Sequence, residues 1–154
     1  MKRIITIFIF LALFIFSQKT HAQSYSSAAG LHLGWFFTGT YKKAVNDGLY
    51  LDLFAGFPSY GGNYLIVGGN IEFHKELEGI DELYYYYGGG ANAIAGSGFF
   101  TFGITGILGL DYKFEEIPLN MSLDWMPGFY FGKYFGGFDV RGGGISVRYI
   151  LSQN

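Results

Sequence analysis

Residues 101–114 read TFGITGILGLDYKF, and the alternation in this stretch decides the fold class. The even-numbered positions carry the large apolar side chains, which are Phe102, Ile104, Leu108, Leu110, Tyr112 and Phe114. The odd-numbered positions are mainly small or polar, and they include Thr101, Thr105, Asp111 and Lys113. Because successive side chains of a strand point to opposite faces, the stretch predicts a long β-strand with one apolar and one polar face.

Similar alternation recurs along the chain in segments of about ten residues, separated by turn signals. After residue 22 no helical period runs for more than a turn, so the sequence predicts an all-β domain. Asn46-Asp47-Gly48 is a signal for a tight hairpin. We expect eight antiparallel strands, with seven or ten left open, at residues 28–36, 37–45, 48–57, 63–75, 82–93, 100–114, 119–132 and 138–151.

The N-terminus has the layout of a secretory signal peptide. Lys2 and Arg3 precede an unbroken apolar run over residues 4–16, and Thr20 and Ala22 place small residues before a cut after residue 22. The apolar run is shorter than the roughly 20 residues that a membrane-spanning helix needs. We therefore expect residues 1–22 to be a cleaved signal peptide and residues 23–154 to be one β-barrel domain.

Charge and cysteine content exclude several function classes. Cleavage would remove three of the ten basic residues and none of the twelve acidic ones, which leaves a net charge of −5. A nucleic-acid partner would need a basic face, so none is expected. The chain has no cysteine, which excludes disulfides, thiolate metal sites and a lipid-modified N-terminal cysteine.

The charged residues share the small and polar face of the expected strands. An eight-stranded interior is too narrow for the many large side chains of the opposite face. If those side chains point outward against lipid, they take up no room in the interior and lie in an apolar solvent. A soluble barrel would instead turn the apolar face inward and the charged face outward. The sequence therefore predicts a closed, up-and-down transmembrane β-barrel.

Connections and aromatic residues are consistent with two membrane interfaces. We expect short turns at 46–48, 76–81 and 115–118 on one rim, and looser Gly- and Ser-rich loops at 58–62, 93–99 and 133–137 on the other. Amphipathic rings prefer the headgroup level of a bilayer. One expected belt is Tyr84 to Tyr87, Tyr112, Phe114 and Tyr149, and the other is Trp35, Phe57, Phe99, Phe129 and Phe131.

Several motifs resemble short outer-membrane barrel proteins common in Bacteroidota. They are residues 39–42 (GTYK), 86–91 (YYGGGA), 107–112 (ILGLDY), 117–125 (IPLNMSLDW) and the closing strand 145–151 (ISVRYIL), which is similar to a barrel-insertion signal. The resemblance covers nearly the whole mature chain and implies a small barrel of the outer membrane protein A/X architecture. The resemblance implies no activity. Separately, we expect a monomer in contact with outer-membrane lipid, lipopolysaccharide and, during assembly, the insertion machinery.

The inward polar side chains are the main candidate site. Because buried charges need partners, we expect them to pair across the lumen and fill it. This predicts a structural or surface-interaction role without catalysis or cofactor, and a narrow ion pore is the alternative. The set is Lys42, Asp52, Glu72, Asp111, Lys113, Asp124 and Arg148.

His32 and His74 leave a third possibility, an enzyme that modifies lipid A. No serine and acid at a recognisable spacing accompany either histidine, so ordinary lumen or rim positions are preferred. A metal site from the two histidines and Glu72 is weaker still. Pro127 deletes a ladder hydrogen bond, so it predicts either a bulge or a weak lateral seam, and a seam could admit lipid into the barrel. Residues 142–144 (GGG) disturb the alternation and predict a bulge.

Overall fold

A computed structural model of the protein describes residues 25–133 and 136–153. The expected signal peptide, residues 1–22, lies outside the described residues. The strands are β1 (Tyr25–Gly34), β2 (Phe36–Asn46), β3 (Leu49–Pro58), β4 (Tyr64–Glu76), β5 (Leu83–Gly96), β6 (Phe99–Lys113), β7 (Leu119–Trp125), β8 (Gly128–Gly132), β9 (Gly137–Asp139) and β10 (Gly143–Gln153). In this part of the chain, no helix is long and apolar enough to cross a membrane.

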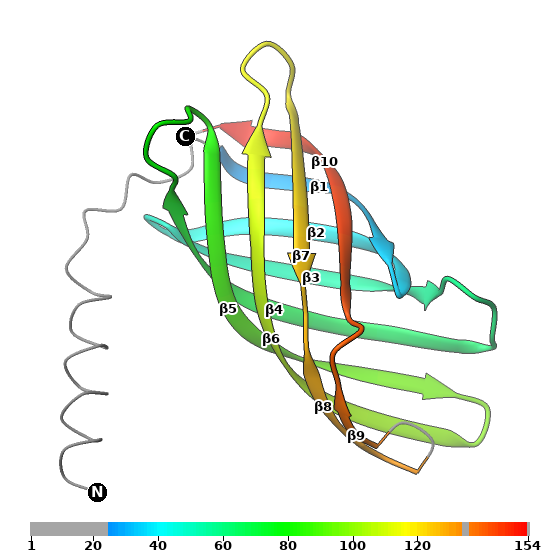
Figure 1. The fold of residues 1–154 in the computed structure, drawn as a ribbon. Helices are drawn as coiled ribbons and strands as arrows, with labels where there is room; N and C mark the ends of the chain where they lie inside the picture. Colours follow the sequence, from blue (N-terminus) through cyan, green and yellow to red (C-terminus); the bar gives the residue numbers. More distant parts are fainter. Residues whose placement is uncertain (1–24, 134–135, 154) are drawn as a thin grey trace, which may run out of the picture.

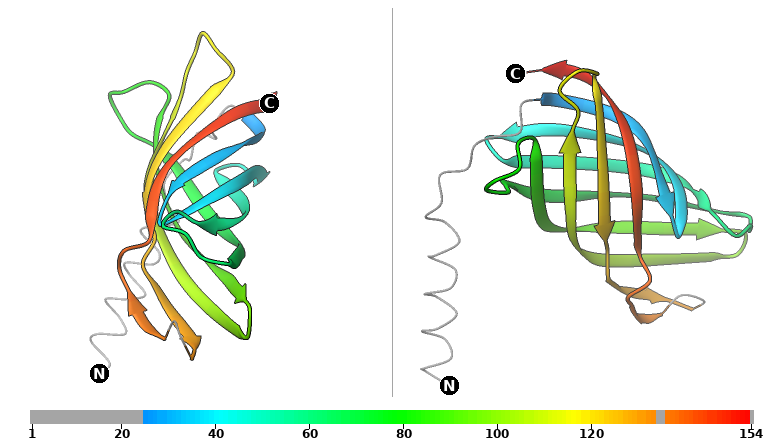
Figure 2. Two further views of the ribbon diagram at one scale, coloured as in Figure 1. Left: turned by 90° about the vertical axis from the view of Figure 1, so that its right-hand side faces the viewer. Right: turned by 45° about the horizontal axis from the view of Figure 1, so that its top comes forward.

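The strands form a closed antiparallel barrel (Figures 1 and 2). Each of β1 to β6 pairs with its neighbours along the chain, and β1 pairs with β10 to close the sheet. β7 and β8 both pair with β6, so they occupy one position in the wall. β10 pairs with β7 and β9 with β8, so they share the next position. The expectation of an eight-stranded, closed, up-and-down barrel is confirmed.

At two neighbouring positions of the eight-stranded wall, the strand is interrupted, and the two interruptions lie at the same height. Pro127 separates β7 from β8, and residues 140–142 separate β9 from β10. The backbone stays connected there, because Gly106 donates to the carbonyl of Pro127 at 2.9 Å and Met126 donates to that of Gly142 at 3.0 Å. Gly143 follows with a φ of 119°, which favours glycine. The disturbances expected at Pro127 and at residues 142–144 thus coincide in one kink of the wall.

The polar faces of the strands turn inward and the apolar faces outward. On β6, Thr101 and Asp111 are fully buried, while Ile104 and Leu108 are about half exposed, at 55% and 54%. The other long strands follow the same rule, as the alternating burial along β4 and β7 shows. The interior is therefore built largely from polar and charged side chains, and the outer surface from large hydrophobic ones.

The expected aromatic belts hold only in part. Tyr112 and Tyr149 are exposed on the outer surface, as are Phe129 and Phe131 towards the other end. Tyr84 and Tyr86 are 5% and 0% exposed, which corrects their place in the belt. The reason is the strand period, because a run of four tyrosines must send alternate rings into the lumen.

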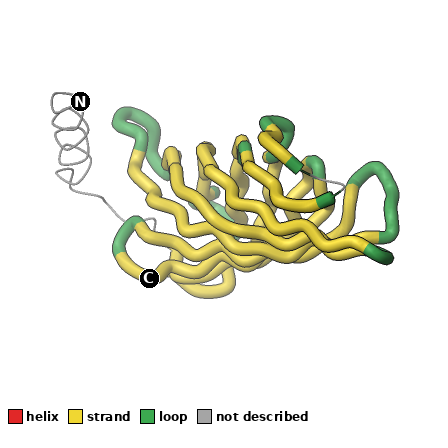
Figure 3. Tube along the Cα trace, turned by 90° about the horizontal axis from the view of Figure 1, so that it is seen from below, coloured by secondary structure: helices red, strands yellow, loops and turns green. Residues whose placement is uncertain are grey.

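The expected contrast between the two rims is wrong. On the rim that carries both ends of the barrel domain, the connections are residues 47–48, 77–82 and 114–118. On the other rim, which we call the mouth, β1 and β2 are joined by Trp35 alone, β3 and β4 by 59–63, and β5 and β6 by Ser97 and Gly98. The expected loop at 133–137 lies partly outside the described residues. The connections that the structure describes are short on both rims, and they lie at the strand ends (Figure 3).

Candidate functional site

Lys42 is the centre of one buried ion cluster in the lumen. Its Nζ lies 2.7 Å from Oε2 of Glu72 and 3.3 Å from Oδ2 of Asp111, and all three side chains are fully buried. Asn120 donates a hydrogen bond to the other oxygen of Asp111. The contacts join β2, β4, β6 and β7, so the cluster crosses the barrel interior.

Arg148 is the centre of a second cluster. Its Nη2 donates to Oδ2 of Asp52 at 2.8 Å, its Nη1 to Ser122 at 2.8 Å and its Nε to Thr40 at 3.3 Å. Thr40 in turn donates to Asp52. The guanidinium is 2% exposed, and each of its nitrogens has a partner, so the desolvated charge is compensated in the way that a buried ion requires.

An aromatic layer lies beside these clusters, towards the rim with the termini. The ring of His74 stacks on Tyr86 at 4.7 Å between centroids and 8° between planes, and it contacts Tyr50 at 4.6 Å. His74 Nε2 lies 2.9 Å from Oε2 of Glu72. Tyr86 also faces the ammonium of Lys42, which lies 4.7 Å from its ring centroid. Tyr25 packs against Tyr50, so rings and charges together fill this part of the lumen.

The seven predicted lumen residues do not form one group. Lys42, Asp52, Glu72, Asp111 and Arg148 make up the two buried clusters. Asp124 accepts a hydrogen bond from the hydroxyl of Tyr86 at 3.1 Å, and it lies on the mouth side of them. Lys113 lies near the opposite rim, where its Nζ is 3.7 Å from Oε2 of Glu82.

His32 has a serine and an acid beside it that the sequence spacing did not reveal. Ser146 lies opposite it in the β1–β10 ladder, with Oγ 2.9 Å from His32 Nδ1. Oδ2 of Asp124 is 3.8 Å from the same nitrogen. A serine hydrolase needs the serine and the acid on different ring nitrogens, and Ser146 is also fully buried. In this arrangement Ser146 and Asp124 therefore do not take the positions that the serine and the acid have in a serine hydrolase.

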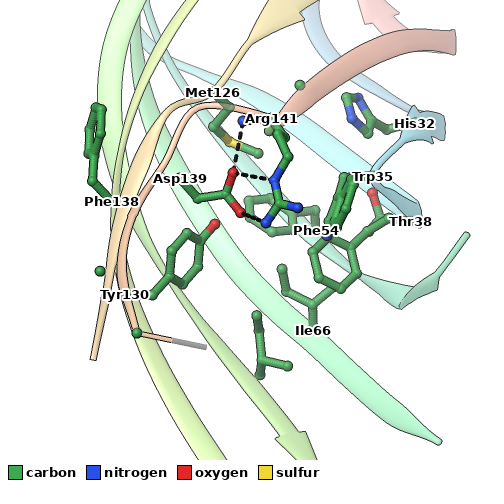
Figure 4. A pocket seen from close by; sticks show the side chains of 16 residues that line it. His32, Trp35, Thr38, Phe54, Ile66, Met126, Tyr130, Phe138, Asp139 and Arg141 are labelled. Carbon is green, nitrogen blue, oxygen red and sulfur yellow. Dashed lines mark hydrogen bonds and ion pairs between the residues drawn. The ribbon is translucent and has the colours of Figure 1, made fainter. Parts of the chain in front are cut away.

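The interior changes character towards the mouth. A pocket of about 180 Å³ opens there (Figure 4), and its inner walls include Phe54, Ile66, Ile94 and Tyr130. Met126 forms part of its floor, and the amide of Asn70 donates to the Met126 sulfur at 3.6 Å. Beneath lies a cavity of about 20 Å³, room for about one water molecule, which Met126 and Arg148 both line.

One ion pair stands at the edge of this pocket. The Nε and Nη2 atoms of Arg141 donate to the two carboxylate oxygens of Asp139 at 2.9 and 2.7 Å. The guanidinium also lies over the ring of Trp35, 4.4 Å from its centroid. Arg141 thus connects the β9 side of the mouth to the β1–β2 connection, as Figure 4 shows.

The two histidines and Glu72, the weakest of the sequence interpretations, do not come together as one metal site in residues 25–133 and 136–153. In this part of the chain, no three histidine or acidic side chains converge as ligands. Glu72 and His74 do lie together, and the ammonium of Lys42 pairs with the same carboxylate oxygen, Oε2, that His74 contacts. His32 belongs to a different cluster, next to Asp124.

Fold and site together define a closed eight-stranded antiparallel barrel with an ion-filled lumen and a pocket at the mouth that is lined by both apolar and polar side chains. No protein-family model, curated protein or solved structure matches the chain.

Proposed function

We propose that the protein is an integral outer-membrane β-barrel with a structural or surface-interaction role and without catalysis. The observation that carries the proposal is the inverted distribution of side chains. Leu31, Leu53, Ile104, Leu123 and Val147 come from five different strands, and each is 40–56% exposed on the outside. In water such a continuous apolar surface would cause aggregation, whereas in a bilayer it is the solvated face.

The filled lumen supports a structural role rather than transport. The Lys42 and Arg148 clusters connect strands from different sides of the barrel, and both are desolvated. An open aqueous path would instead need charged groups that face solvent. The short connections on both rims leave little surface for large extracellular contacts, so we place any surface interaction at the mouth.

The outer membrane is the proposed location because of the N-terminal segment and the motif resemblance. Residues 1–22 have the features of an export signal, and spanning barrels are found in outer membranes. We further propose that the protein is monomeric, lies in contact with lipopolysaccharide and is inserted by the barrel-assembly machinery.

Reconstitution tests the proposal. The mature chain, residues 23–154, should require detergent or lipid vesicles to stay in solution and should show β-type circular dichroism there. A closed barrel should also migrate differently on a gel before and after boiling. A mature chain that is folded and monodisperse in buffer without detergent would contradict the membrane assignment.

A further inference from the structure

The mouth pocket has an apolar inner wall, and its lining also includes the polar side chains of His32, Thr38, Asp139 and Arg141. Ile66 and Ile94 are directly opposite each other in the β4–β5 ladder and are each 2% exposed, and Phe54 and Tyr130 extend the same wall. A cavity of about 150 Å³ with apolar walls can bind benzene. The 180 Å³ pocket therefore has room for a ring or for the end of a saturated chain.

Beside this pocket the hydrogen-bonded wall of the described strands is interrupted between β1 and β9, and we call this interruption the gap. β1 ends at Gly34, which is paired with Gly144, and β9 lies beyond that pair and is hydrogen-bonded only to β8. Trp35 and Phe36 line the pocket on one side of the gap, and residues 136–139 line it on the other. The guanidinium of Arg141, which pairs with Asp139 on its own side, lies over the ring of Trp35 and so reaches across the gap.

The outer surface beside the gap is strongly apolar. Phe138 on β9 is 72% exposed, and Phe129 and Phe131 on β8 are 47% and 54% exposed. If the barrel lies in a bilayer, as proposed above, hydrocarbon chains cover these rings. A chain that moved inward between β9 and Trp35 would exchange one apolar environment for another.

The floor of the pocket limits how far a chain can enter. Met126 lies at the kink between β7 and β8 and separates the pocket from the small cavity next to Arg148. The hydrogen bond from Asn70 holds its sulfur there. An apolar chain would therefore end against Met126 and Phe54 without contact to the buried ions.

We propose that the mouth pocket binds the end of a saturated hydrocarbon chain, which enters through the gap between β9 and the β1–β2 connection. The chain belongs to a membrane lipid or to a free fatty acid. This inference depends on the proposed membrane location, but it makes a separate claim about the interior.

Two tryptophan reporters on one strand distinguish the interior from the lipid-facing surface. Trp35 and Trp125 are the two tryptophans of the chain and are first replaced by phenylalanine. Phe54→Trp then places a reporter in the pocket, and Leu53→Trp places one at the same height on the outer face, where Leu53 is 47% exposed. Each protein is reconstituted in phosphatidylcholine vesicles with plain or brominated acyl chains, because bromine quenches tryptophan on contact.

We expect brominated vesicles to reduce the fluorescence of both reporters. Ile94→Phe, which fills the pocket, should abolish the loss of fluorescence of the reporter at position 54. It should leave the loss of fluorescence at position 53 unchanged. Ile66→Phe is the second filling variant if the first fails to fold, as judged by the gel shift on boiling. Ile104→Phe adds the same ring on the outer face and should change neither signal.

A second arm identifies the source of the chain. In plain vesicles, added 11-bromoundecanoate supplies the same hydrocarbon as a free acid. The proposal is supported if the reporter at position 54 is quenched in either arm and the quenching is lost when the pocket is filled. The arm in which quenching occurs identifies the source, which is a membrane lipid or a free fatty acid. If position 53 is quenched and position 54 is quenched in neither arm, the lipid pocket is refuted while the membrane location stands. If position 53 is not quenched by brominated vesicles, the membrane location itself fails.

Discussion

Arg148 on β10 donates a 2.8 Å hydrogen bond to Asp52 on β3, past the two strands that separate them in the sheet. The pair is buried, and Thr40 and Ser122 complete the hydrogen bonding of the guanidinium. It therefore ties distant parts of the wall together through the lumen.

Removing one member of this pair should be costly. Arg148→Met leaves Asp52 buried without its cation, and loss of one partner of a buried pair costs about 3–5 kcal/mol of unfolding free energy. Urea unfolding in micelles, followed by tryptophan fluorescence, measures the change. Arg141→Met is the control: its guanidinium pairs with Asp139 at an exposed site, where solvent screens the pair and little loss of unfolding free energy is expected. Equal losses in both variants would contradict a special role for the buried pair.

The paired ions should also keep the lumen closed. We expect the natural protein to give no conductance steps in planar bilayers. The double variant Lys42→Ala, Arg148→Ala removes both central cations and leaves Asp52, Glu72 and Asp111, so any current it passes should be cation-selective. Steps in the natural protein that change with Asp111→Asn or Asp124→Asn would instead establish the pore.

Close approach of backbones makes particular glycines irreplaceable. A Cβ at Gly88 would fall on the carbonyl oxygen of Ile71 in the neighbouring strand. Gly106 lies on β6, where a Cβ would meet its nearest atom at an ordinary 4.0 Å. Gly88→Ala should therefore lower the urea midpoint and the boiling-shift temperature clearly, while Gly106→Ala should leave both nearly unchanged. The opposite order would mean that β4 and β5 are spaced differently.

Lipid A offers a direct test of catalysis. Expression of the protein should leave the mass spectrum of lipid A unchanged, because Ser146 and Asp124 approach the same nitrogen of His32. A mass change that disappears with His32→Ala or Ser146→Ala, in variants that still show the boiling shift, would overturn the non-catalytic assignment. His74→Ala is tested in parallel, since His74 is the other lumen histidine.

Strand periodicity was enough to predict the barrel and most of its strand boundaries. The expected strand 119–132 includes both β7 and β8, and 138–151 includes most of β9 and β10. The period also assigns Lys42, Asp52 and Arg148 to the inner face, because each lies in register with small or polar neighbours. The run of tyrosines at 84–87 was harder to assign, since all four side chains have the same chemistry. Only the odd or even position along the strand decides whether a ring points outward or into the lumen.

Contacts between strands could not be predicted in the same way. The pairing of His32 with Ser146 depends on the register between the first and last strands, which are joined by no turn. The same is true of Arg148 and Asp52. The coincidence of the two wall breaks, which creates the mouth pocket, also depends on how Trp125 aligns with Gly143. A single sequence shows that each strand is disturbed but not that the disturbances meet.

The β1–β10 pairing also determines when the barrel can form. β1 can pair with β10 only after β10 has been synthesised. Nearly the whole domain therefore has to be synthesised before the sheet can close. Until then, β1 and β10 are both open edges that can pair with other chains. Their exposure has to be covered during export, and truncation within 143–153 should therefore yield an aggregating chain rather than a smaller barrel.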